Sequence, residues 1–269
     1  DAQESRGLGD VYKRQVHDHV SAAKKAAFIH VDYVQAGYTR RLDKDCYVDF
    51  DRIFAVSDET AGVLAGVYPE CQQKLSVFHN LIDTETIRQK ALLPAEKSMH
   101  EGIRLLTVGR LTPQKGFDCA VYALKLLLEK QYPVYWYIIG EGPEYGRLTQ
   151  LARSLHVEDH FIFLGMQTNP YPYFKMADFY IHATRFEGKS IAIQEAQVLG
   201  CAIAASDCSG NREQIVSGVD GLLCPFSPEG IANAVEYLIE HPQTAKSFGR
   251  AAAQKACHFE NDIHMIRDL

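Results

Sequence analysis

The chain has 269 residues, enough for one large or two smaller domains, and its 46% hydrophobic and 23% charged residues are ordinary for a globular protein. A formal net charge of −6 argues against nucleic-acid binding, which usually needs a basic face. No apolar run approaches about eighteen residues, so no membrane-spanning helix is predicted.

The seven cysteines form no C-x-x-C pair, and several lie in apolar stretches, as Cys201 and Cys224 do. This pattern is typical of free thiols in a reducing cytosol rather than of a disulfide framework or a zinc site. We therefore predict a cytoplasmic protein. The basic doublets Lys24-Lys25 and Arg40-Arg41 leave open a weak peripheral contact with the inner face of a membrane.

The first part of the chain predicts an incomplete domain. Residues 1–15 are polar and aperiodic, so they are interpreted as a disordered or non-native lead. Residues 16–90 contain three apolar stretches that predict strands, at 26–31, 50–57 and 75–80, and a capped helix after the second. These elements form about half of a doubly wound domain, too few to close a good core alone, and are interpreted as the C-terminal part of a Rossmann-like domain whose beginning is absent. The polar stretch 83–102 is expected to be a linker.

Strands and helices then alternate regularly. The predicted strands are 103–109, 134–140, 161–165, 178–183, 202–206 and 222–225, and the predicted helices are 117–130, 144–155, 171–176, 190–199, 211–216, 231–240 and 245–257. This alternation predicts an α/β fold for 91–269, with a parallel sheet and helices on both faces. Ligands bind such sheets at the carboxyl ends of the strands.

Charged residues follow two of these strand ends. On the loop after Gly109, Arg110 and Lys115 offer a planar fork and a point charge that suit a diphosphate. After the strand 178–183, Glu187 precedes a helix and Glu195 lies about two turns into it. Between the two carboxylates, the backbone N–H groups of Lys189, Ser190 and Ile191 form an anion site. This layout suits a sugar nucleotide, although solvated charges on a surface loop and helix would show the same spacing.

Several motifs occur in one order: Val108-Gly109-Arg110-Leu111 with Lys115-Gly116, Gly140-Glu141-Gly142-Pro143, Phe161–Gly165, Phe186-Glu187-Gly188-Lys189-Ser190 with Glu195-Ala196, Ser206–Gly210 with Glu213, and Gly218–Leu223. Together they resemble the retaining glycosyltransferases of family 4, whose GT-B fold has two facing Rossmann-like domains. The match covers about 100–255, and 26–83 resembles the tail of that family's N-terminal domain. The resemblance implies that 16–90 are the C-terminal part of an N-terminal, acceptor-side Rossmann-like domain with its linker, and that 91–269 bind the nucleotide sugar. Leu81 departs from the family, which usually has glycine at this hinge position.

The resemblance implies roles for individual residues. Arg110 and Lys115 would bind the donor diphosphate beside Gly109, and Glu195 would accept hydrogen bonds from the ribose. Glu187 would lie beside the donor sugar, above the helix start formed by Gly188, Lys189, Ser190 and Ile191. Met166 and Gln167 would hold the base, largely through their backbone. His30 follows a strand where the family often has a histidine near the reacting sugar; a strand-end histidine without a special role is the equal alternative.

The implied reaction transfers a sugar from a UDP- or GDP-sugar to an acceptor hydroxyl with retention of configuration. The expected partners are this donor and a glycan or lipid-linked acceptor in cell-surface glycan or polysaccharide synthesis. No divalent-metal motif stands out, so neither a metal nor a cofactor is expected. A nucleotide-sugar 2-epimerase and a non-catalytic nucleotide-sugar-binding fragment stay open as alternatives. A dehydrogenase is disfavoured because no G-x-G-x-x-G follows a first strand.

Overall fold

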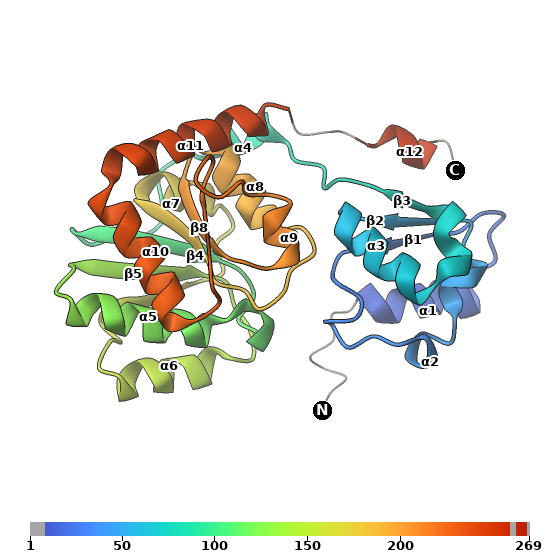
Figure 1. Ribbon diagram of the computed structural model, residues 1–269, viewed down its shortest axis with the longest axis horizontal. Coiled ribbons are helices and arrows are strands. Elements are labelled where there is room, and N and C mark those ends of the chain that lie inside the picture. The colour runs from blue at the N-terminus through green and yellow to red at the C-terminus, as the bar shows by residue number, and fades with distance from the viewer. Residues whose placement is uncertain (1–8, 259–261, 268–269) are drawn as a thin grey trace. The chain divides into compact units, whose positions relative to one another are not determined.

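The computed structural model describes residues 9–258 and 262–267, and these divide into two compact units (Figure 1). Unit 1 contains the described residues up to Leu81, the short segment Phe186–Lys189 and the C-terminal residues from 262. Unit 2 contains the remainder, Ile82–Arg185 and 190–258. The chain therefore enters unit 1 again for four residues before it returns to unit 2.

Unit 1 is built on a parallel sheet of three strands in the order β1 (Ala26–Ile29), β2 (Arg52–Ala55), β3 (Leu75–Val77). Its helices are α1 (Gly9–His19), α2 (Arg40–Asp43), α3 (Asp58–Val67) and α12 (His264–Arg267), with 3₁₀ turns at Cys46–Asp49 and Pro69–Lys74. Helix α3 begins where the Ser57 side chain accepts the N–H of Thr60, as its sequence predicts. The core is rich in aromatic rings, Tyr33 and Tyr47 among them.

The lead predicted for residues 1–15 differs from the structure. Helix α1 begins at Gly9, so the prediction of disorder is wrong from that residue on, and residues 1–8 lie outside the described residues. Lys13 is buried, and its Nζ donates to Asp43 Oδ2 at 3.1 Å and to the Tyr47 hydroxyl at 2.7 Å. A buried ion pair between residues distant in sequence leaves no trace in hydrophobic periodicity, which is why this helix was missed.

Unit 2 contains a parallel sheet of six strands in the order β6-β5-β4-β7-β8-β9. The strands are β4 (Ile103–Val108), β5 (Val134–Ile139), β6 (Phe161–Gly165), β7 (Phe179–His182), β8 (Ala202–Ser206) and β9 (Leu222–Cys224). The helices are α4 (Thr84–Lys90), α5 (Phe117–Glu129), α6 (Tyr145–Ser154), α7 (Tyr171–Met176), α8 (Ile191–Val198), α9 (Ser209–Arg212), α10 (Pro228–Glu240) and α11 (Pro242–Ala256), with a 3₁₀ turn at Pro113–Lys115. This confirms the predicted α/β fold class.

Alternate residues of each strand pack on opposite faces of this sheet. Leu105 and Trp136 join one core with α5, α6, α10 and α11, whereas Leu106 and Tyr137 join another with α7 and α8. The strands are therefore buried on both faces, which explains their nearly continuous apolar sequence. The strand order reverses at the β4–β7 pair, so the carboxyl ends of these two strands form the topological switch point, where ligands bind in open α/β sheets.

The boundary between the units differs from the predicted division into 16–90 and 91–269. It falls at Leu81, and the stretch expected to be a linker from Asp83 begins with helix α4 of unit 2. Ile87 of α4 is buried against Val198 and Ala256, a core contact that the polar composition of this stretch hides. Helix α9 also begins earlier than predicted, at Ser209 instead of Asn211.

Three properties concern the described chain as a whole. All seven cysteines are free, and most are buried, as the sequence indicates. Within residues 9–258 and 262–267, no helix has the length and apolar character needed to cross a membrane. The same described residues contain no cluster of histidine, cysteine or carboxylate side chains able to hold a metal ion.

Candidate functional site

The loop after β4 is held by close backbone packing. Gly109 N donates to the carbonyl of Ile139 at 2.9 Å, and a Cβ at Gly140 would lie only 2.0 Å from the Gly109 carbonyl oxygen. A Cβ at Gly142 would lie 2.4 Å from the carbonyl oxygen of Leu111. The two glycines after β5 are therefore required by the chain itself, because any side chain there would displace the loop.

This loop carries both cations predicted to bind a diphosphate. Lys115 lies with its aliphatic chain over Gly109, since a Cβ there would contact Lys115 Cδ at 3.7 Å. Arg110 is exposed, and its guanidinium makes no hydrogen bond or ion pair with the part of the chain that the structure describes. The structure thus brings Gly109, Arg110 and Lys115 together at the switch point, as their order in the sequence requires.

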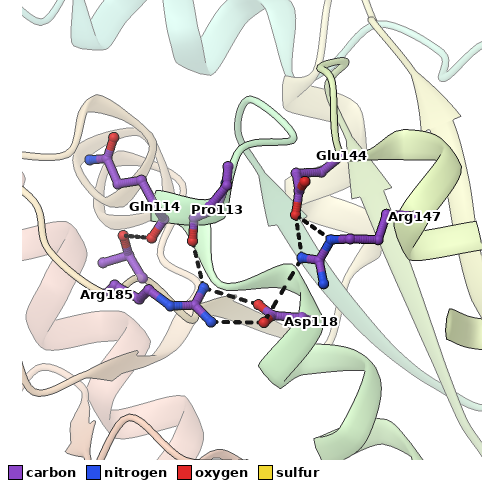
Figure 2. A network of polar contacts seen from close by, with 7 residues as sticks. Pro113, Gln114, Asp118, Glu144, Arg147 and Arg185 are labelled. Atoms are coloured by element: carbon purple, nitrogen blue, oxygen red, sulfur yellow. Dashed lines mark hydrogen bonds and ion pairs between the residues drawn. The ribbon is translucent and has the colours of Figure 1, made fainter. Parts of the chain in front are cut away.

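A polar network ties this loop to the residues that follow β7 (Figure 2). The Arg185 guanidinium donates to both oxygens of Asp118 at 3.0 and 2.7 Å and to the carbonyl of Pro113. The Gln114 carbonyl accepts the backbone N–H of Arg185 at 2.8 Å and the Thr184 hydroxyl at 3.1 Å. The loops after β4 and β7 therefore form one rigid assembly.

Arg147 extends the network on its outer side. It donates to Glu144 and lies 3.9 Å from Asp118. Burial alone would raise the pKa of Asp118, but its hydrogen bonds with Arg185 hold that pKa below its usual value.

The start of helix α8 is fixed by a buried glutamine. Gln214 Oε1 accepts the N–H of Ser190 at 2.7 Å, and Gln214 Nε2 donates to the Ser190 carbonyl at 2.8 Å. The Ser190 hydroxyl in turn accepts the N–H of Ile193 at 3.4 Å as the helix cap. Gln214 lies in the stretch predicted as the helix 211–216, where no pattern marks it as a partner of Ser190. Because Gln214 accepts the Ser190 N–H, that group is engaged within the protein and is not offered to an anion as the sequence predicts.

Glu195 lies on the second turn of α8, half-buried in unit 2. Its Oε1 accepts a hydrogen bond from the Tyr171 hydroxyl at 3.0 Å. Burial raises the pKa of Glu195, and the Tyr171 hydrogen bond opposes that rise. Burial and the neighbouring carboxylate raise the pKa of Tyr171 to about 12, so its hydroxyl stays protonated at neutral pH. Tyr171 is a further residue that the motif spacing did not indicate.

The loop after β6 contributes backbone more than side chains. Met166 is exposed. The side chain of Gln167 donates a hydrogen bond to the nearby Leu164 carbonyl at 2.9 Å. A cleft of about 540 Å³ opens at the carboxyl ends of β5 and β6. It is lined by Lys97, Glu141, Tyr145, Phe163, Leu164 and Gly165 together with Gly140 and Gly142. Lys97 is a polar lining residue that the sequence did not single out.

The remaining candidates belong to unit 1. Gly188 packs against the end of β1, where a Cβ would lie 2.3 Å from the His30 carbonyl oxygen, and the Lys189 carbonyl accepts Asn80 Nδ2 at 3.2 Å. Glu187, which precedes Gly188 in the sequence, is buried. His30 is exposed in part and stacks on Phe28, yet desolvation by surrounding protein lowers the pKa of its imidazole. The structure therefore gathers His30, Glu187, Gly188 and Lys189 in one unit and the other candidates in the second.

Unit 2 is thus an open, doubly wound α/β domain with a basic loop and a glutamate-bearing helix at its switch point. Residues 87–255 match the family described as glycosyl transferases group 1. The chain belongs to this family.

This chain spans about half the length of the curated relatives that it matches. A 4-alpha-N-acetylgalactosaminyltransferase of Campylobacter jejuni, whose name specifies a diphospho-undecaprenol-linked acceptor, is 30% identical over 198 residues, covering 73% of this chain and 52% of the relative. An amylovoran biosynthesis glycosyltransferase of Erwinia amylovora is 28% identical over 175 residues, covering 62% of this chain and 41% of the relative.

Solved structures show the same fold. HepE of Anabaena, solved with UDP and glucose, superposes with a TM-score of 0.77 at 18% identity, covering 91% of this chain and 70% of that one. Sucrose-phosphate synthase of Thermosynechococcus elongatus has a TM-score of 0.78 at 16% identity, covering 96% and 69%. The fold is thus that of the GT-B glycosyltransferases.

Proposed function

We propose that this protein is a retaining glycosyltransferase of family 4 that transfers a sugar from a UDP-sugar to an acceptor hydroxyl. The observation that supports this most is the loop of Arg110 and Lys115, which the Arg185–Asp118 pair ties to the segment leading into α8. Two cations and a helix N-terminus at one switch point suit the diphosphate of a nucleotide sugar.

The proposed chemistry places charge stabilisation on the leaving group. The bond between the sugar C1 and the diphosphate oxygen breaks, and the negative charge grows on that oxygen. Arg110, Lys115 and the positive N-terminal end of the α8 dipole stabilise this charge more in the transition state than in the ground state. The acceptor oxygen bonds to C1 from the same face, and its proton passes to the departing phosphate oxygen.

The two candidate catalytic residues have distinct roles in this proposal. Glu187 is the carboxylate beside the developing positive charge of the sugar. His30, whose pKa is lowered by desolvation, is neutral at pH 7 and can accept a hydrogen bond from a sugar hydroxyl. Met166 and Gln167 hold the base through their backbone, and Glu195 accepts hydrogen bonds from the ribose.

The donor and acceptor classes rest on the relatives. HepE was solved with UDP and with UDP and glucose, and the Campylobacter relative is named for a lipid-diphosphate-linked acceptor. We infer a UDP-sugar donor and a glycan or lipid-linked acceptor in surface glycan or polysaccharide synthesis, at the cytoplasmic side of a membrane.

Calorimetric titration with UDP tests the proposal. One charged hydrogen bond to phosphate contributes about 1.5–3 kcal/mol, so Arg110→Ala and Lys115→Ala should each weaken UDP binding roughly ten-fold or more. Lys125→Ala is the matched control, because Lys125 is a surface residue of α5 that pairs with Glu129. Unchanged affinity in both site variants would refute the site.

Product analysis with UDP-N-acetylglucosamine separates the reaction types. Transfer to an acceptor or slow donor hydrolysis supports a transferase. Epimerisation of the donor without an acceptor would indicate a 2-epimerase, and tight binding without turnover would indicate a non-catalytic module.

A further inference from the structure

Tyr171 and Glu195 form a pair that joins two loops of unit 2. Tyr171 is the first residue of α7, directly after the loop that contains Met166 and Gln167, and its hydroxyl lies 3.0 Å from Glu195 Oε1. Within the described chain, Tyr171 is the partner found for this carboxylate. One carboxylate oxygen of Glu195 is therefore engaged by the protein, and no hydrogen bond within the described residues engages the second.

The position of the tyrosine is itself fixed from several sides. Its backbone N–H donates to Asn169 Oδ1 at 3.4 Å, and Asn169 Nδ2 donates to the Lys90 carbonyl at the end of α4 at 2.9 Å. Its ring packs against the cluster of Ile87 and Val198. The hydroxyl is thus placed by α4, α7 and α8 together, and free rotation of the Glu195 carboxylate is restricted by a rigid neighbour.

A neutral donor is suited to this task. A lysine or arginine beside Glu195 would orient the carboxylate but would also cancel its charge and weaken it as an acceptor. Tyr171 orients it and leaves the charge in place.

Other charged groups around the pair are placed as follows. Asp83 at the start of α4 lies close enough to raise the pKa of Tyr171, and Arg88 of α4 donates to Cys257 Sγ at 3.5 Å. Lys255 of α11, which packs on α8, bonds to Asp220 and to the Gln214 carbonyl. The pKa of Glu195 therefore depends mainly on the burial of its carboxylate, which raises it, and on the hydrogen bond from Tyr171, which lowers it.

We propose that Tyr171 is a positioning residue for nucleoside recognition, which fixes one oxygen of Glu195 so that the other meets the ribose hydroxyls. This inference rests on the proposed function, in which Glu195 binds the ribose. Since Tyr171 also begins the helix that follows the base loop, it links the recognition of the base with that of the ribose.

The test measures dissociation constants of UDP and of inorganic pyrophosphate between about pH 5 and about pH 8. The proteins are the wild type, Tyr171→Phe, Glu195→Gln and the control Tyr237→Phe. Tyr237 lies in α10, and its ring stacks on His241 just after that helix. UDP affinity of the wild type should fall as acid protonates Glu195. In Tyr171→Phe this fall should begin at higher pH, because the variant loses the hydrogen bond that lowers the pKa of Glu195.

At pH 7 Tyr171→Phe should bind UDP about five-fold more weakly, the effect of one ordinary hydrogen bond, and should bind pyrophosphate as the wild type does. A general loss of structure would weaken both ligands, and that result overturns the positioning role. The positioning role is also overturned if Glu195→Gln weakens UDP binding but the UDP affinity of Tyr171→Phe depends on pH in the same way as that of Tyr237→Phe. If Glu195→Gln leaves UDP binding unchanged, the ribose role in the proposed function fails, and the inference fails with it.

Discussion

Arg185 and Asp118 form a two-pronged ion pair: Nη1 lies 3.0 Å from Oδ1 and Nη2 lies 2.7 Å from Oδ2. The guanidinium also lies over the Phe226 ring at 5.0 Å and donates to the Pro113 carbonyl. A planar fork can satisfy the carboxylate, the carbonyl and the ring at once, which an ammonium group cannot do. This pair therefore holds the loop that carries Lys115.

Arg185→Lys should weaken UDP binding several-fold, because the basic loop loses its fixed anchor. The stability loss should be only about 0.5–1 kcal/mol, since Arg185 is partly exposed and solvent screens the pair. Arg104→Lys is the matched control: Arg104 pairs in the same two-pronged way with Asp178 at the opposite, amino edge of the sheet. Urea denaturation and UDP calorimetry should show similar stability losses in both variants but weaker UDP binding only in Arg185→Lys.

Acid stability should depend on Asp118. Its folded-state pKa is depressed, so the stabilisation is present above the unfolded-state pKa and is lost as the pH falls through the folded-state value. Asp118→Asn should therefore flatten the decline of the free energy of unfolding below about pH 4. Urea titrations at a series of pH values measure this slope, and an unchanged slope would contradict the assignment.

Gly188→Ala should disturb the contact between the Phe186–Lys189 segment and the end of β1. The new Cβ would lie 2.3 Å from the His30 carbonyl oxygen, and backbone must move to accept it, at a cost of about 1–3 kcal/mol. Gly62→Ala is the control, because Gly62 lies on α3 with no atom within 4 Å of such a Cβ, and it should stabilise the protein by about 0.5–1 kcal/mol. Opposite shifts in melting temperature are expected.

Gln214→Leu should destabilise the protein and weaken pyrophosphate binding. It removes the acceptor of the Ser190 N–H and one of two donors to the Ser190 carbonyl, which keeps its hydrogen bond from the Gln194 N–H. A buried N–H left without a partner costs about 1–3 kcal/mol. Gln254→Leu on the exposed side of α11 is the control and should change neither property. Normal pyrophosphate affinity in Gln214→Leu would show that the start of α8 does not bind the phosphates.

Chelation should leave UDP binding unchanged. The proposed site neutralises the diphosphate with Arg110, Lys115 and the helix start, so no cation is needed for affinity. Calorimetric titrations with EDTA and with excess Mg²⁺ should give equal dissociation constants for UDP. A strong dependence on Mg²⁺ would require a metal ligand set that this proposal does not contain.

Local patterns predicted much of unit 2. The strands from β4 to β9 lie within about two residues of their predicted positions, because continuous apolar runs between turn residues are a local signal. The loop of Arg110 follows β4 and the helix of Glu195 follows β7, as predicted, because the strands that precede them are local signals. The roles of these residues stay predictions.

Contacts between distant residues were not predictable in this way. Tyr171 reaches Glu195, and Lys13 reaches Asp43, across stretches of chain with no periodic relation between the partners. Helix α4 was missed because a single buried residue, Ile87, anchors an otherwise polar segment. Such partners are set by how elements pack, which neither spacing nor composition records.

Because residues Phe186–Lys189 belong to unit 1, a single break in the chain cannot separate the two units of this protein. A cut after Leu81 would separate residues Phe186–Lys189 from the rest of unit 1 and leave them attached to unit 2. Unit 1 would then lack Gly188, which packs against the His30 carbonyl. Glu187 and Glu195, which are separated by eight positions in the sequence, already belong to different units in the intact chain. A division of this protein into two separately expressed pieces would therefore have to include residues Phe186–Lys189 with unit 1.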